Sequence, residues 1–173
     1  MLHNIKRPAS EESSDYYKTY IHKVPKDDFL QVLKQAVPET TALMRGFSEE
    51  QWMHRYSPGK WSIKEVMLHI IDTERIMAYR ALRISRGDKT PMAGFDQDDY
   101  IPFSKADSRS PESIIEEYNA VRQASIQLFE HLDDEHLATV GTASGQPFTP
   151  RALGFAVAGH EIHHLMVLQD RYL

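Results

Sequence analysis

Two histidines near the C-terminus, His160 and His164, are the residues of this chain best suited to chemistry. They lie four positions apart in a segment that reads as helix, so both imidazoles project from one stripe, one turn apart. Two imidazoles in this arrangement can hold one divalent cation if a third ligand comes from another helix. His69, in an apolar helical segment upstream, is the candidate third ligand. The spacing therefore predicts a three-histidine metal site with open coordination positions.

A histidine on an apolar stripe is more often a core residue whose ring nitrogens find hydrogen bonds than a metal ligand. Three such histidines change that balance, because burying three imidazoles without a compensating partner is costly. Metal binding is therefore the favoured interpretation. His163 points about 60° away from His160 around the helix and is expected to flank the site. Five histidines in polar or terminal settings are expected at the surface: His3, His22, His54, His131 and His136.

The same segment also matches the His-Glu-x-x-His pattern of zinc peptidases. A zinc peptidase needs a further protein ligand after this motif, and few residues follow it. The extended form of the motif requires Gly and His where this chain has Val167 and Asp170. The sequence therefore disfavours a peptidase.

Three carboxylates are weak candidates for a catalytic role. Asp72 and Glu74 follow His69 closely, so either can orient its ring or act as a general base. Exposed charges on a helix flank are an equally good explanation of both. Glu161 is interpreted as a solvated residue or as a group that supports a ligand. No serine or threonine has the sequence context of an activated nucleophile.

The composition limits the class of protein. The chain has 173 residues, of which 41% are hydrophobic and 26% are charged, as expected for a single globular domain spanning residues 1–173. Its net charge of −5 argues against a nucleic-acid partner. The absence of cysteine excludes disulfides and thiolate ligands. Because the sequence shows neither a long apolar run nor an apolar leader, we expect a cytoplasmic protein with no membrane partner.

Helical periodicity indicates an all-α chain, most economically a four-helix bundle. A capping box of Ser62 and Glu65 starts the second helix, and Ser110 and Thr149, each followed by proline, start the third and fourth. Pro38 predicts a kink or a break in the first helix. The four predicted helices cover approximately residues 27–47, 62–87, 110–129 and 149–173.

The remaining segments are an N-terminal arm and long connections. The arm, residues 1–25, places Tyr16 and Tyr20 on one helical face and is expected to pack a short helix on the body. A further short helix is predicted at 48–52. Strands are minor at most. The connections over residues 48–61, 88–109 and 132–148 are long enough to cross the bundle or to cover a cleft.

Helix geometry sets a condition for the metal site. At about 1.5 Å per residue, His69 lies about 10 Å along its helix, whereas His160 and His164 lie about 15–21 Å along theirs. Parallel helices would leave these levels about 5–11 Å apart, whereas antiparallel helices bring His164 within a few ångströms of His69. The site therefore requires the second and fourth helices to be antiparallel neighbours.

The chain resembles the DinB/YfiT-like metalloenzyme family over nearly its whole length. The segments that carry the resemblance are YIHKVP (20–25), WSIKEVMLHIIDTER (61–75), GFDQD (94–98), RAL (151–153) and GHEIHH (159–164). This joint pattern is far more specific than a histidine spacing alone.

The resemblance implies an up-down-down-up four-helix bundle with a long crossover between the second and third helices, often assembled as a homodimer. It implies that His69, His160 and His164 bind nickel or zinc. Family members with known chemistry include thiol-dependent transferases and a mycothiol-dependent isomerase. We therefore expect a metal-dependent enzyme acting on a small molecule, first of all in thiol transfer with a low-molecular-weight thiol. The alternatives are amide or ester hydrolysis and a non-catalytic, metal-stabilised stress-response module.

Overall fold

The structure is a computed structural model that describes residues 5–25 and 27–173. Its four long helices are α2 (Phe29–Gly46), α4 (Ile63–Ser85), α6 (Pro111–Glu130) and α8 (Pro150–Arg171). Four short helices accompany them: α1 (Asp15–Ile21), α3 (Glu49–Met53), α5 (Gln97–Ser104) and α7 (Asp134–Ala138). Two 3-10 turns, η1 (Ser10–Glu12) and η2 (Ala106–Ser108), and two strands, β1 (Gly141–Ala143) and β2 (Gln146–Phe148), complete the described elements.

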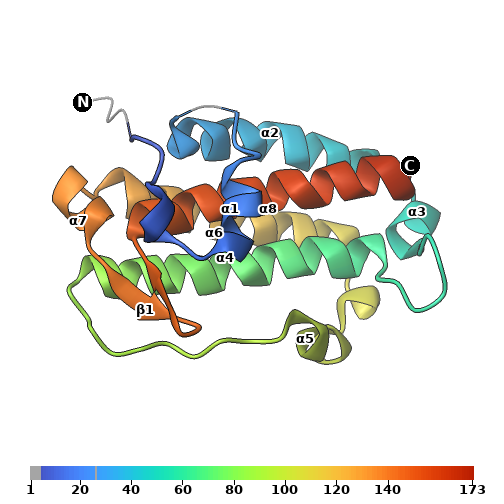
Figure 1. Cartoon of the computed structure of the whole chain (residues 1–173). Helices are drawn as coiled ribbons and strands as arrows, with labels where there is room; N and C mark the ends of the chain where they lie inside the picture. The colour runs from blue at the N-terminus through green and yellow to red at the C-terminus, as the bar shows by residue number, and fades with distance from the viewer. Residues whose placement is uncertain (1–4, 26) are drawn as a thin grey trace.

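The long helices form an up-down-down-up bundle, as predicted. Helices α2 and α8 run in one direction and α4 and α6 in the other, and the connection over residues 86–110 runs back along the bundle carrying α5 (Figure 1). Helix α4 packs against α6 and α8, and α2 packs against the same two helices. Helices α4 and α8 are therefore antiparallel neighbours, which is the condition that the three-histidine site requires.

The predicted caps set the start of each long helix that carries a candidate histidine ligand. In α4 the Ser62 hydroxyl accepts a hydrogen bond from the Glu65 backbone N–H, and the Glu65 carboxylate accepts one from the Ser62 N–H. In α8 the Thr149 hydroxyl accepts from the backbone N–H of Ala152. Each cap satisfies N–H groups that the first turn leaves unpaired, so the helix begins at a defined residue.

The predicted break at Pro38 is absent, because α2 is one element from Phe29 to Gly46. Proline removes one intrahelical hydrogen bond. Packing compensates for this loss, since Leu33 and Met44, on either side of the proline, are both fully buried.

The N-terminal arm is fixed to the bundle through α1, which lies across α8 (Figure 1). Gly159 permits this contact: a Cβ at this position would lie 2.0 Å from the backbone oxygen of Tyr20. The lack of a side chain on α8 therefore lets α1 approach at the level of the histidines. The hairpin β1–β2, paired with Gly141 opposite Phe148, is joined to the crossover by a bridge between Met92 and Ala143.

Two apolar clusters form the core. One gathers around Phe29, Phe129 and Phe155, and the other around Trp52 and Ile63. In α4, α6 and α8 the residues of the two clusters occupy opposite halves of the helix, with buried polar residues between them. The core thus contains a polar layer across three helices. Within residues 5–25 and 27–173, no helix combines the length and the apolar character that crossing a bilayer demands.

Candidate metal centre

The polar layer contains a cluster of three imidazoles from two helices. Nε2 of His160 lies 3.0 Å from Nε2 of His69 and 3.1 Å from Nε2 of His164. The candidate ligand atoms of all three residues lie within 4.8 Å of one another. His69 and His160 are buried and His164 is half-buried. The antiparallel packing of α4 on α8 brings together the three residues that the sequence singled out.

The rings are held by groups that the sequence did not identify as part of the site. Thr73 places its hydroxyl oxygen 3.4 Å from Nδ1 of His69, the nitrogen on the far side of the ring. The Trp61 ring lies 4.9 Å from the His69 ring, and the Tyr20 ring lies 5.3 Å from the His160 ring, measured between centroids. Thr73 follows His69 by one helical turn, a spacing from which this contact could have been predicted. Trp61 and Tyr20 come from a loop and the arm, so helical spacing gave no signal for them.

Burial keeps the three imidazoles neutral, because removal from water disfavours the charged form. Desolvation, with a smaller effect of His163, lowers the pKa of His69 from 6.5 to about 4. Desolvation, followed by the effects of His69 and His163, lowers the pKa of His164 to about 3. The pKa of His160 also falls well below its ordinary value, mainly through burial. At neutral pH each ring therefore has a nitrogen lone pair available to an electrophile or a proton donor.

This donor set fits a divalent cation. Metal–nitrogen bonds of about 2.0–2.1 Å in a tetrahedron place the ligand nitrogens about 3.3 Å apart. The two separations that involve His160, 3.0 and 3.1 Å, are close to this value, and the ligand atoms of His69 and His164 lie within 4.8 Å of each other. Three neutral imidazoles leave the charge of the ion uncompensated and a fourth position free, as in catalytic rather than structural zinc sites. The three residues are thus suited to hold a catalytic ion.

The carboxylates Glu74 and Glu161 face a different partner. Both accept hydrogen bonds from Arg122, at 2.8 and 2.7 Å from Nη2, and all three side chains are almost completely buried. Tyr118 and Thr40 also donate to Glu161, at 2.7 and 2.8 Å. Burial excludes one of the two interpretations left open by the sequence, namely that Glu74 and Glu161 are solvent-exposed charges. Their oxygens bind the Arg122 guanidinium and two hydroxyl groups, so they join helices in the polar layer.

Asp72 lies outside the cluster as well. It is half-buried, forms an ion pair with Arg75 at 3.4 Å, and lines a surface cavity with Phe103 of α5. Burial raises the pKa of its carboxyl group, and the nearby Arg75 opposes this effect. His69 is oriented by Thr73 and not by Asp72.

The remaining histidines divide as the sequence indicated. His163 is half-buried beside the cluster, with its ring centroid 5.0 Å from that of His164. Exposed positions are confirmed for His22, His54, His131 and His136, whereas His3 lies outside the described residues.

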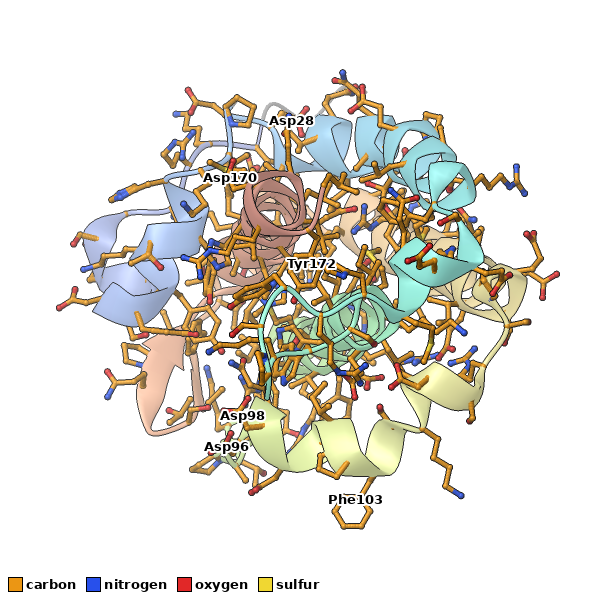
Figure 2. All side chains as sticks on the ribbon, turned by 90° about the vertical axis from the view of Figure 1, so that its right-hand side faces the viewer. Asp28, Asp96, Asp98, Phe103, Asp170 and Tyr172 are labelled. Carbon is orange, nitrogen blue, oxygen red and sulfur yellow. The ribbon has the colours of Figure 1, made fainter. Side chains whose placement is uncertain are left out.

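Two cavities open beside the imidazoles, and residues at or near the start of α5 line both of them. The larger, of about 740 Å³, is lined by His164, Trp61, Lys60, Arg171 and Asp98, among others. The smaller, of about 280 Å³, is lined by His160, Thr73, Tyr20, Phe95 and Asp96, among others. Asp96 and Asp98 lie together at the start of α5, while Phe103 near its end points into solvent (Figure 2). A small molecule can therefore approach the imidazoles from two directions.

The fold and the cluster define this chain as a four-helix-bundle protein with a candidate metal centre on α4 and α8. The chain belongs to the DinB superfamily, because a sequence model of that family matches residues 33–168. This match includes all three histidines of the cluster.

Similar proteins carry related descriptions. The chain is 27% identical over 150 residues to OB0413 of Oceanobacillus iheyensis, named as a candidate metal-dependent hydrolase, covering 83% of this chain and 84% of the relative. The structure of YfiT from Bacillus subtilis superposes on this chain with a TM-score of 0.68 at 19% identity, over 95% of this chain and 91% of YfiT. YfiT is described as a probable metal-dependent hydrolase with an unusual four-helix bundle topology. A mycothiol-dependent maleylpyruvate isomerase superposes with a TM-score of 0.64 at 12% identity, over 84% of this chain and 61% of the isomerase. The two structural likenesses establish a shared fold.

Proposed function

We propose that the three-histidine cluster binds a divalent cation and that the protein hydrolyses an amide or ester of a small molecule. One observation carries this proposal: three neutral imidazoles direct nitrogens at one another across the antiparallel pair α4 and α8, at 3.0 and 3.1 Å, next to two cavities. The description of the Oceanobacillus relative as a candidate metal-dependent hydrolase agrees with this assignment.

The residues of the chain have separate tasks in this proposal. His69, His160 and His164 supply nitrogen ligands, for which zinc and nickel are both suitable ions. Thr73 holds the His69 ring through Nδ1, at 3.4 Å, and so keeps Nε2 directed at the cluster. Trp61 packs its ring against His69, and Tyr20 packs its ring against His160. When bound, a divalent cation supplies Lewis acidity and makes water nucleophilic at neutral pH.

Thiol transfer, which the sequence placed first, has weaker support than hydrolysis. The isomerase that uses mycothiol resembles this chain only in fold, at 12% identity. A thiol-dependent reaction would use the same three histidines, so experiment has to separate the two activities. A homodimer, implied by the family resemblance, remains part of the proposal and can be measured by sedimentation.

Assaying the zinc- or nickel-loaded protein against a panel of chromogenic esters and anilides, without any thiol, tests hydrolysis. We expect turnover that disappears in His160→Ala and persists in His136→Ala, because His136 is exposed and pairs with Asp133. Turnover that requires glutathione or cysteine together with an aryl chloride acceptor would establish a transferase instead. No turnover, combined with a chelator-induced fall in melting temperature, would indicate a non-catalytic metal-stabilised module.

A further inference from the structure

A buried cation without a counter-ion lies near the smaller cavity. Arg80 of α4 is only 2% exposed, yet within residues 5–25 and 27–173 no carboxylate lies at ion-pair distance from its guanidinium. Its Nη2 donates to the backbone oxygen of Ala93 at 2.8 Å and to the Ser144 hydroxyl at 3.0 Å. Its Nη1 is buried and has no hydrogen-bond partner among the described residues. A buried charge of this kind is costly unless an anion compensates it.

The Arg80 guanidinium is bordered by residues that line this cavity. Ser144, which accepts its hydrogen bond, is one lining residue, and Phe95 is a second, with its ring centroid 5.7 Å from the guanidinium carbon. Tyr17 is a third: burial raises the pKa of its hydroxyl, while the positive charge of Arg80 and a side-chain hydrogen bond with Arg80 oppose that rise. His160 and Thr73 line the same cavity. One space of about 280 Å³ therefore connects the surroundings of Arg80 with an imidazole of the candidate metal centre.

By contrast, Arg122, a second fully buried arginine, lies in the polar layer and is satisfied by two carboxylates. The fold thus neutralises one buried arginine internally and leaves the other next to a cavity. Among the described residues that line this cavity, the only carboxylate belongs to Asp96, which is exposed and accepts a hydrogen bond from the Asp98 backbone N–H as the cap of α5.

We propose that Arg80 binds the carboxylate of the substrate in this cavity while the bond to be cleaved lies at the three histidines. This inference rests on the proposed function and narrows it to amides or esters that carry an anionic end. A guanidinium matches a carboxylate in shape and in hydrogen-bond geometry. A carboxylate, with one negative charge, also balances the single positive charge of Arg80. A phosphate dianion would add a second negative charge next to the carboxylate of Asp96.

The geometry of α4 sets the length of such a substrate. His69 and Arg80 are eleven residues apart, so their Cα atoms are separated by about 16 Å along the helix axis. The arginine side chain leans toward the start of the helix and thereby toward His69, which shortens this separation. A substrate with several bonds between its carboxylate and its reactive carbonyl is therefore required.

Hydroxamates, which chelate metal ions, provide probes for this geometry. The probes are the monohydroxamates of linear dicarboxylic acids with two, four and six methylene groups, each paired with the uncharged alkane hydroxamate of equal length. Calorimetry on the zinc-loaded protein measures their dissociation constants. We expect the carboxylate to strengthen binding at least about tenfold in the longer probes and less in the shortest one, which cannot reach Arg80.

Arg80→Gln should abolish this preference and leave binding of the uncharged hydroxamates unchanged. Arg80→Lys should retain part of it, because the charge remains while the planar pair of donors is lost. Arg86→Gln, at the exposed end of the same helix, is the matched control and should behave as the original protein does. Metal content and melting temperature, measured for every variant, show whether each one is folded and loaded.

The outcomes separate this inference from the proposed function. Equal binding of charged and uncharged hydroxamates to the original protein would overturn the role of Arg80 and leave the metal centre intact. A preference that emerges only in Asp96→Asn would also overturn it, because Asp96 would then be the anion that occupies the site. If no hydroxamate binds, the proposed metal centre is refuted, and the carboxylate site is then tested with suberate, which does not depend on a metal. A rise in melting temperature with suberate that Arg80→Gln abolishes supports the carboxylate site, and no rise refutes it.

Discussion

Nε2 of His69 lies 3.0 Å from Nε2 of His160, although 91 positions separate the two residues in the chain. The contact exists because α4 and α8 are antiparallel neighbours in the bundle (Figure 1). Two imidazole nitrogens at this distance either share a proton or bind a common electrophile. The predictions below distinguish the roles of these rings and of the residues around them.

The first prediction concerns metal stoichiometry. The purified protein incubated with zinc or nickel and then desalted should retain about one ion per chain, measured by mass spectrometry of the metal. His160→Ala should weaken binding by more than the 10–100-fold typical of losing a group outside the ligand set, because one of three ligands is gone. His136→Ala should bind as the original protein does. Full retention of metal in a variant with all three histidines replaced by alanine would refute the assignment.

The second prediction concerns the stability of the metal-free protein at acid pH. Unfolded histidine has a pKa near 6.5, whereas burial lowers the pKa of folded His69 to about 4 and that of His164 to about 3. Below pH 6.5 the unfolded chain therefore binds more protons than the folded chain, so the free energy of unfolding falls as the pH falls. For His69 alone the loss approaches about 3 kcal/mol by pH 4. Urea titrations at pH 7, 6 and 5 in the presence of a chelator measure it.

His69→Leu is the matched variant for this measurement. This substitution removes one of the histidines whose pKa is lowered by folding. The free energy of unfolding should therefore depend less steeply on pH between 6.5 and 4. A parallel dependence in both proteins would mean that His69 titrates normally in the folded state. Because burial lowers the pKa values of these histidines, protons should compete with the metal for their nitrogens only below pH 6.5. An ordinary histidine would begin to do so near pH 6.5.

The third prediction concerns the buried charges of Arg122. Arg122→Met would leave Glu74 and Glu161 without their cation, so we expect it to lower the free energy of unfolding by about 3–5 kcal/mol. Glu161→Gln leaves one positive and one negative charge, and Tyr118 and Thr40 still have an oxygen to donate to. Its cost should therefore be nearer about 1 kcal/mol. Chemical denaturation compares the two variants.

Metal content tells whether Glu161 has a second role. Because its oxygens contact Arg122 and two hydroxyl groups, Glu161→Gln should bind metal with unchanged stoichiometry and affinity. A loss of metal in a variant that remains folded would show that Glu161 acts on the metal centre directly.

The fourth prediction concerns the contact between the arm and α8. In Gly159→Ala the new methyl group would meet the backbone oxygen of Tyr20 at 2.0 Å, so α1 has to move away. We expect a loss of about 1–3 kcal/mol and faster proteolysis of the arm, because overpacking forces the backbone to shift. Gly46→Ala, at an exposed helical position with open space, should be neutral or slightly stabilising. Equal proteolysis of the two variants would contradict the role of Gly159.

The sequence predicted the fold well because the signals were local. Ser62 with Glu65, and Thr149 with Pro150, mark helix starts through hydrogen bonds within a single turn, and the structure places α4 and α8 accordingly. The absence of a break at Pro38 has a non-local cause: the local cost of proline is outweighed by packing on both sides, which depends on other helices.

The sequence by itself determined which histidines share a helical stripe, because a turn of helix fixes the spacing of His160 and His164. Only the tertiary structure decided that Thr73 rather than Asp72 orients His69 and that Glu74 and Glu161 neutralise Arg122. It also decided that Arg80 has no carboxylate partner among the residues that the structure describes. The physical reason is that a charge is neutralised by whatever lies next to it in space. Those neighbours come from other helices and loops, whose rotation and level no local pattern specifies.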